Sequence, residues 1–77
     1  MEGSIQVLDC RDELCPGPVI KVARTLKTLA LNQVLEVHAT DPGAVPDMEA
    51  LAQRTGQQIL GIVQEPDRTR ILIRRLR

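Results

Sequence analysis

Residues 15–30 read CPGPVIKVARTLKTLA, and the arrangement of the rest of the chain follows from this segment. Its two prolines interrupt any preceding regular structure, and proline is tolerated in a helix only in the first turn. Beyond Pro18, apolar residues recur every three or four positions, with lysine, arginine and threonine between them. The pattern predicts an amphipathic helix whose apolar stripe comprises Val19, Val22, Ala23, Leu26, Leu29 and Ala30.

Four short segments with the composition of β-strands surround this helix. Residues 5–8 precede it and end at a polar cluster, residues 9–13. Residues 34–40 follow it and alternate, with Leu35, Val37 and Ala39 on one face, which predicts a strand buried on one side. Residues 59–63 and 70–74 flank a turn at 66–68 and are expected to form a hairpin.

A second helix is predicted over residues 47–55, with Pro46 in its first turn and Gly56 just past its end. The order is therefore β-α-β-α-β-β. Strands with one buried face and helices with one apolar stripe require two layers. We expect an α+β, two-layer sandwich in which both helices cover one face of a four-stranded mixed sheet, as a single domain over residues 1–77.

Composition argues against a protein that coats nucleic acid or spans a membrane. The 77 residues carry ten basic and ten acidic side chains, a formal net charge of zero, and no aromatic residue. Proteins that coat nucleic acid rely on surplus positive charge and on aromatic side chains that stack on bases. No apolar run approaches the length of a membrane span, and the first residues lack signal-peptide features, so a cytoplasmic protein is expected. The sequence does not indicate an oligomeric state.

Cys15 is the first candidate for chemistry, because it stands just before the predicted first helix. The positive end of a helix favours the thiolate, the reactive form of cysteine. Pro16 and Pro18 would stiffen the segment, with Gly17 between them, and hold Cys15 in an extended conformation. Arg11 would stabilise the thiolate. Modest activation is expected because three nearby acids would oppose it: Asp9, Asp12 and Glu13.

Cys10 and His38 have weaker claims to a site. Cys10 shares the parity of Leu8 and is expected to pack, the alternative being an accessory thiol that forms a disulfide with Cys15. His38 is expected to be a solvated strand residue, away from Cys15. A metal site built from these three residues fails on ligand spacing and number, so neither a metal nor a cofactor is expected.

Arginines crowd the end of the chain. Five of the ten basic residues lie in the last ten positions: Arg68, Arg70, Arg74, Arg75 and Arg77. They either protect an edge strand from associating with other sheets or form a basic patch that docks an acidic partner or a tRNA backbone.

Several of these segments together resemble a known family. They are Leu8-Asp9-Cys10-Arg11, Cys15-Pro16-Gly17-Pro18-Val19-Ile20, Leu35-Glu36-Val37, Thr40-Asp41-Pro42-Gly43-Ala44, Thr55-Gly56 and Ile71-Leu72-Ile73-Arg74. The pattern is similar to that of the TusA/SirA family of small sulfur carriers, whose hallmark is CPxP at the start of the first helix. The resemblance implies the same sandwich fold and a sulfurtransferase-type persulfide relay, rather than a turnover enzyme.

The resemblance also implies partners. The cysteine of the motif, Cys15 here, would accept sulfane sulfur from a cysteine desulfurase or a rhodanese-type donor and pass it to a downstream acceptor protein. Outlets known in the family include tRNA thiolation, molybdenum-cofactor supply and sulfur oxidation. Two alternatives stay open: an RNA-binding module of the same topology, and a regulatory interaction domain with a redox-sensing thiol.

The chain departs from the family pattern at three places. Relatives usually carry glycine where this chain has Asp12, and commonly leucine where it has Glu13. The turn before the second predicted strand has Asn32, a residue that tolerates the left-handed backbone conformation. These departures suggest a divergent or YedF-like branch of the family.

Overall fold

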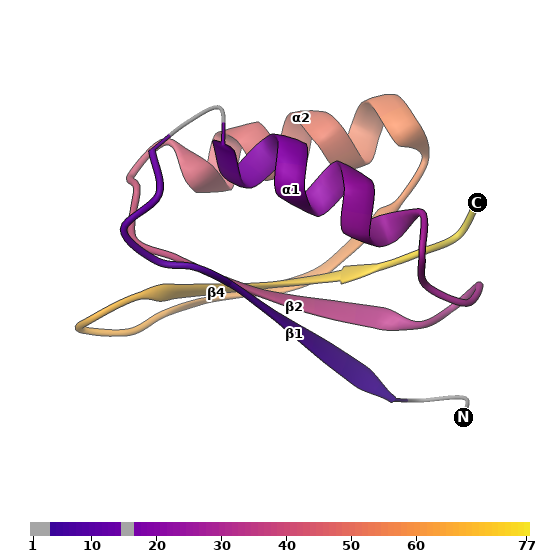
Figure 1. Cartoon of the computed structure of the whole chain (residues 1–77), viewed down its shortest axis with the longest axis horizontal. Helices are drawn as coiled ribbons and strands as arrows, with labels where there is room; N and C mark the ends of the chain where they lie inside the picture. Colours follow the sequence, from indigo (N-terminus) through magenta and orange to yellow (C-terminus); the bar gives the residue numbers. More distant parts are fainter. Residues whose placement is uncertain (1–3, 15–16) are drawn as a thin grey trace.

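The computed structural model describes residues 4–14 and 17–77 of the chain, and its order of elements confirms the predicted β-α-β-α-β-β arrangement. The elements follow one another along the chain as shown in Figure 1. They are β1 (Ile5–Cys10), α1 (Gly17–Leu26), β2 (Val34–Ala39), α2 (Ala44–Thr55), β3 (Gln58–Gln64) and β4 (Thr69–Arg74).

The four strands form one mixed sheet in the order β1-β2-β4-β3. Strand β1 pairs parallel to β2, while β4 lies between β2 and β3 and is antiparallel to both. The interpretation of the arginine-rich last strand as an edge strand is therefore wrong. Its physical reason is the crossover through α2, which places β3 one position beyond β2, so that the chain returns through the hairpin into the space between them.

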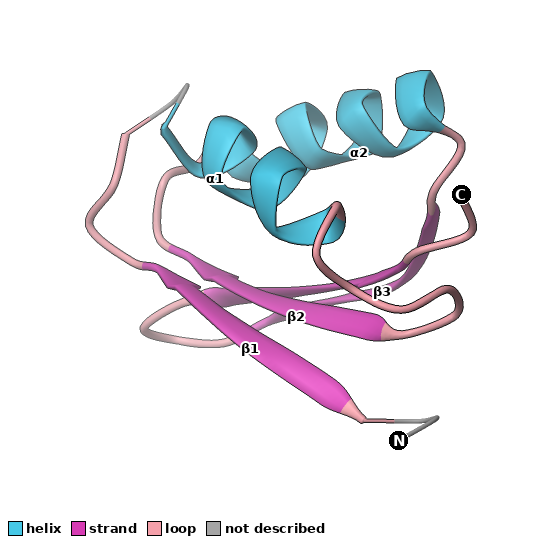
Figure 2. Cartoon of the chain, turned by 45° about the vertical axis from the view of Figure 1, so that its right-hand side comes forward, coloured by secondary structure: helices cyan, strands magenta, loops and turns pink. Residues whose placement is uncertain are grey.

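Both helices cover the same face of the sheet and leave the other face uncovered, as Figure 2 shows. The core lies between these two layers. The alternation predicted for β2 places Leu35, Val37 and Ala39 at its centre, where they are at most 1% exposed. Met48 from α2 and Val22 from α1 meet this row and are fully buried. The predicted α+β two-layer sandwich is confirmed.

Helix α1 is shorter than the apolar stripe predicts, because it ends at Leu26. The next residues tighten into a turn in which the N–H groups of Thr28 and Leu29 donate to carbonyls three residues earlier, at 2.9 and 3.3 Å. Such bonds commonly close the last turn of a helix. Leu29 nevertheless remains buried, so the stripe predicts the buried face correctly beyond the end of the helix itself.

Helix α2 begins at Ala44, three residues earlier than predicted, with Gly43 as its N-cap. Pro46 falls in the first turn, where its missing N–H would have no partner within the helix. Gly56 ends the helix in the left-handed conformation, at φ = 75°. Strand β1 also runs further than predicted, to Cys10, because residues 9 and 10 pair with His38 and Ala39 of β2.

The described residues contain no helix long and apolar enough to cross a membrane.

Asn32 adopts the left-handed conformation anticipated from its residue type, at φ = 69°. Its N–H donates to the carbonyl of Arg75 at 2.6 Å, which joins the turn before β2 to the chain that follows β4. The turn therefore helps to set the position of the C-terminal residues.

Replacing Asn32 with alanine should lower the free energy of unfolding by about 1 kcal/mol, because a residue with a Cβ and no local hydrogen-bonding group is strained in this conformation. Asn32→Gly is the matched control and should leave stability close to that of the wild type. Urea denaturation followed by circular dichroism measures both. Equal stability of the alanine and glycine variants would contradict the assignment of strain to this backbone position.

Candidate functional site

The predicted sulfur site lies at the end of the sheet where β1 leads into α1. Cys15 and Pro16 lie outside the described residues, whereas their neighbours Leu14 and Gly17 are described. The N–H of Gly17 donates to the carbonyl of Leu14 at 3.0 Å. This hydrogen bond joins the start of α1 to the residue before Cys15. The Leu14 side chain is 77% exposed.

Pro18 fixes the start of α1 onto the core. Its side chain is less than 2% exposed and belongs to the buried face of α1 together with Val22 and Leu26. The second proline of the motif therefore does more than stiffen the chain, because its burial ties the position of the helix N-terminus to the packing of the domain.

The charges expected to act on the thiolate are largely paired with one another. Arg11 donates from its backbone N and from two guanidinium nitrogens to the Asp9 carboxylate, at 2.9 to 3.0 Å. The Arg11 side chain thereby holds the pKa of Asp9 well below its usual range. Since this carboxylate neutralises Arg11, the predicted support of the thiolate by Arg11 is offset locally.

Lys21 braces the connection from the side of the helix, a role that sequence reasoning missed. Its Nζ donates to the Glu13 carboxylate at 2.7 Å and to the Asp9 carbonyl at 3.1 Å. The hydrogen bond to Glu13 raises the pKa of Lys21. Eight positions separate Lys21 from Glu13, and no helical or strand periodicity relates residues at that spacing across a helix start. No signal in the sequence could have revealed this contact.

Asp12, where the resemblance led us to expect glycine, has the backbone conformation that glycine favours, at φ = 65°. Its N–H donates to the Thr40 hydroxyl at 2.8 Å, which ties the connection to the end of β2. Among the described residues its carboxylate makes no ion pair. Of the three acids expected to oppose a thiolate, Asp12 is therefore the one that makes no ion pair within the described part of the chain.

Cys10 is a free thiol with no exposed surface, packed in the core. Burial raises the pKa of this thiol, and the negative charge of Glu13 adds to the effect. A buried thiol with a raised pKa forms little thiolate at neutral pH. These properties favour the packing role; the accessory role of Cys10 stays a prediction.

His38 is not solvated as the sequence suggested. It lies on the uncovered face of the sheet, but its side chain is only 15% exposed. Its Nε2 contacts the Glu36 carboxylate at 2.6 Å, and its Nδ1 lies 3.0 Å from the Arg68 guanidinium. Its contacts come from Glu36 of β2 itself and from Arg68 of the β3–β4 turn, so strand alternation alone could not predict its burial.

The arginines at the end of the chain do not form one patch. Arg68 pairs with Asp67 at 2.8 Å, and Arg70 lies 3.3 Å from Glu65 and 3.6 Å from Glu36. The other three, Arg74, Arg75 and Arg77, lie at the opposite end of the sheet. Strand β4 runs the length of the sheet, so nearness in sequence did not bring the five together.

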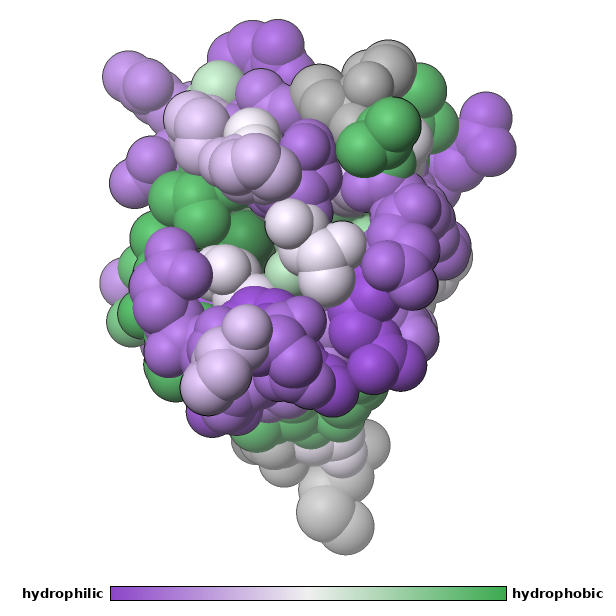
Figure 3. Space-filling view, turned by 90° about the vertical axis from the view of Figure 1, so that its left-hand side faces the viewer, coloured by the Kyte–Doolittle hydropathy of each residue, from purple (hydrophilic) through white to green (hydrophobic). Residues whose placement is uncertain are grey.

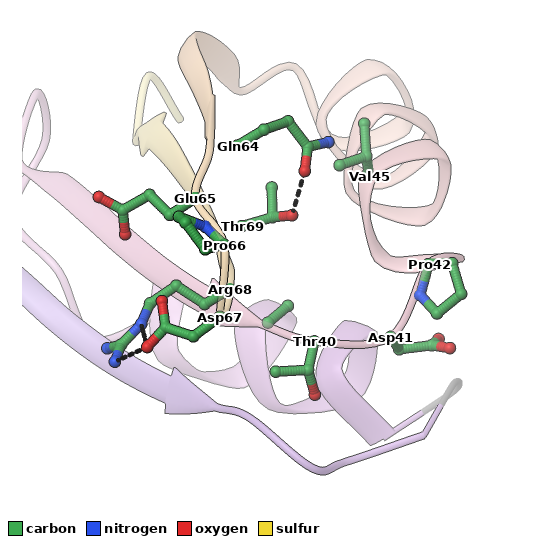
Figure 4. A pocket seen from close by; sticks show the side chains of 11 residues that line it. Thr40, Asp41, Pro42, Val45, Gln64, Glu65, Pro66, Asp67, Arg68 and Thr69 are labelled. Atoms are coloured by element: carbon green, nitrogen blue, oxygen red, sulfur yellow. Dashed lines mark hydrogen bonds and ion pairs between the residues drawn. The ribbon is translucent and has the colours of Figure 1, made fainter.

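A cavity of about 410 Å³ opens at the end of the domain that holds the β1–α1 connection. It lies between the β2–α2 connection and the β3–β4 turn. Figure 4 shows the side chains that line it, including Thr40, which also holds Asp12. Hydrophilic side chains cover most of this end of the molecule in Figure 3. The connection before Cys15 thus stands beside a concave polar surface.

Fold and site together define a class of protein: a two-layer α+β domain with a cysteine motif at the start of its first helix. The chain belongs to the TusA family, since the family model of the sulfurtransferase TusA matches residues 6–75.

Several known proteins are similar to it. The putative sulfur carrier protein YrkF of Bacillus subtilis is 41% identical over 69 residues, 90% of this chain but 37% of that protein, so the chain spans little more than a third of this relative. The sulfur carrier protein TusA of Allochromatium vinosum is 37% identical over 91% of this chain and 92% of its own length.

The crystal structure of a SirA-like protein from Desulfitobacterium hafniense superimposes with a TM-score of 0.82, covering 96% of this chain and all of that one. Its sequence identity is 20%, so this likeness establishes the fold.

Replacing Asp12 with asparagine should raise the rate at which Cys15 is alkylated at neutral pH by about twofold, because it removes one negative charge near the thiolate. Asparagine also tolerates the left-handed backbone, so the fold should be retained. Stopped-flow alkylation in a Cys10→Ala background measures the rate, and 1 M salt should reduce the difference. A rate unchanged at low salt would show that the Asp12 charge does not reach the sulfur.

In the folded protein, Cys10 should resist iodoacetamide at pH 7 and still react slowly at pH 9, since its raised pKa shifts thiolate formation to higher pH. In urea it should react at the rate of an ordinary cysteine. Mass spectrometry after brief labelling of Cys15→Ser isolates the signal of Cys10. Rapid labelling of the folded variant at pH 7 would contradict the burial of this thiol.

Proposed function

We propose that this chain is a sulfur carrier that bears a sulfane sulfur as a persulfide on Cys15. The observation that carries the proposal is the Cys-Pro-Gly-Pro motif at the start of α1 in a chain of the TusA family. The names of its relatives as sulfur carriers support the same function.

The chemistry is a pair of thiol–persulfide exchanges. The Cys15 thiolate attacks the terminal sulfur of a donor persulfide, a new S–S bond forms on Cys15, and the donor thiolate leaves. In the second exchange an acceptor thiolate attacks the terminal sulfur carried by Cys15, and the Cys15 thiolate is the leaving group. Each step forms one S–S bond and breaks one, so no oxidant or reductant is consumed.

The described neighbours of Cys15 support such an exchange by holding the connection in place. Lys21 joins the helix to Glu13 and to the end of β1, while Asp12 is joined to Thr40. Leu14, directly before Cys15, offers an exposed apolar side chain that a partner can cover. Binding of a partner there would exclude water from the reacting sulfurs, and an apolar contact of this kind stabilises the complex.

The donor that we infer is a cysteine desulfurase or a rhodanese-type enzyme, and the acceptor is a downstream protein thiol, with tRNA thiolation among the outlets. Specificity then resides in protein contacts, since the relay needs no resident cofactor. We infer the cytoplasm as its compartment, where thiols such as the free Cys10 stay reduced. The burial of Cys10 makes a sensor that works through a Cys10–Cys15 disulfide the weaker alternative.

Incubation with a cysteine desulfurase and cysteine should add one sulfur atom to the wild type and to Cys10→Ser, and none to Cys15→Ser. The added mass should disappear on treatment with a reducing thiol, because a persulfide exchanges readily. Intact-protein mass spectrometry measures all three proteins.

A rhodanese with thiosulfate serves as the second donor in the same experiment. If neither donor adds sulfur while iodoacetamide still labels Cys15, the carrier function is refuted. Addition of sulfur to Cys15→Ser would place the carrier thiol at Cys10 instead.

A further inference from the structure

Acidic and basic residues occupy different segments of this neutral chain. Residues 14–35, 50–64 and 68–77 contain no aspartate or glutamate, yet they contain nine of the ten lysines and arginines. The fold brings the ends of several of these segments together. In Figure 1 the last turns of α1 and α2 and the chain after β4 lie at the same end of the molecule, opposite the β1–α1 connection.

The cations at this end make no ion pair with an aspartate or glutamate side chain of the described residues, although Arg75 Nε donates to the main-chain oxygen of Arg77 at 2.8 Å. The six ion pairs of the described residues engage Arg11, Lys21, His38, Arg68 and Arg70. The remaining cations of the described residues make no ion pair, and we call them together the basic end: Arg24, Lys27, Arg54, Arg74, Arg75 and Arg77. Helix carbonyls compensate part of this charge, because the C-terminal turns of α1 and α2 carry partial negative charge.

A cavity of about 300 Å³ opens within the basic end, between the last turns of the two helices and the C-terminal residues. Apolar side chains of Ala23, Leu26 and Leu51 contribute to its lining, and Lys27, Arg75 and Arg77 are the charged residues that line it. No acidic residue lines it. The cavity thus combines apolar side chains with positively charged ones.

The wall formed by the C-terminal residues is held in place before any partner binds. The side-chain carbonyl of Gln57 accepts the N–H groups of Leu76 and Arg77, at 2.7 and 3.3 Å. The guanidinium of Arg75 donates to the carbonyls of Lys27 and Leu29, just beyond the end of α1. Such preorganisation reduces the entropy lost on binding.

We propose that the basic end is a docking site for an acidic segment of a partner protein, with one apolar side chain of that segment inserted in the cavity. The apolar lining favours a protein segment over a nucleic-acid backbone, which would use the cations and leave the cavity unfilled. Three of the six cations line the cavity, and the other three, Arg24, Arg54 and Arg74, do not. This spread favours an extended acidic segment over a single small anion, which could meet only a few of them.

This docking site has a consequence that rests on the proposed carrier function. Helix α1 has ten residues and is therefore about 15 Å long, with the cavity at its end and Cys15 two residues before its beginning. A partner bound at the basic end would hold the carrier while leaving Cys15 available for sulfur exchange with another protein.

The test is a ¹⁵N–¹H NMR titration of the full chain at low salt with a twelve-residue glutamate-rich peptide that carries one central leucine. Signals of residues 23–27, 51–57 and 74–77 should shift. The double variant Lys27→Gln with Arg77→Gln should weaken binding substantially, and each single change by about fivefold, as expected for exposed charge pairs. Gln64→Glu, which changes the net charge by as much as either single change, is the matched control and should bind as the wild type does. Gln64 lies at the opposite end of the sheet, where it pairs with Thr69, and a carboxylate there can still accept the Thr69 hydroxyl.

Two further reagents separate the occupants. A peptide with serine in place of leucine should bind more weakly to the wild type, and Ala23→Leu, which fills the cavity, should remove that difference. Equal binding of both peptides to the wild type, absence of shifts at the basic end, or tighter binding of a single-stranded RNA of the same charge would overturn the proposal. So would concentration-dependent self-association that Lys27→Gln abolishes, because the occupant would then be a second copy.

The titration is repeated with Cys15→Ser, in which binding should be unchanged. Because this variant carries no reactive thiol at position 15, the docking result and the persulfide result fail or succeed separately.

Discussion

The antiparallel pairing of β4 with both β2 and β3 is the constraint on which most of this structure depends. It buries Ile71 and Ile73 in the centre of the core, under both helices. Because of this pairing, β4 runs from the β3–β4 turn to the opposite end of the sheet. The paired and unpaired arginines are separated for that reason, and the C-terminal residues come to lie beside the ends of α1 and α2.

The order and faces of the elements could be predicted because they rest on local periodicity. The alternation of residues 34–40 and the helical spacing after Pro18 each concern neighbours in sequence, and the structure confirms both. Strand order could not be predicted in the same way. Whether a hairpin strand is central or at an edge depends on where the preceding crossover places its partner, and no residue of β4 records that position.

The same distinction between local signals and contacts between elements applies to the candidate site. Its motif is a local signal, and so is the tolerance of Asn32 for the left-handed conformation. The contact of Lys21 with Glu13 and the cover over His38 join residues from different elements, so they emerge only from the packed fold. Asp12 combines a backbone conformation that glycine favours with a charged side chain, and only the structure shows the first of these two properties.

Cations gathered at the basic end of a molecule of zero formal net charge give that molecule an electric dipole moment. Such a molecule experiences a torque in the field of a charged partner before any contact is made, so it turns as it approaches. Rates of association can then depend on ionic strength even though the product of net charges is zero. For the sulfur relay proposed above, orientation during the encounter would shorten the search for the correct contact.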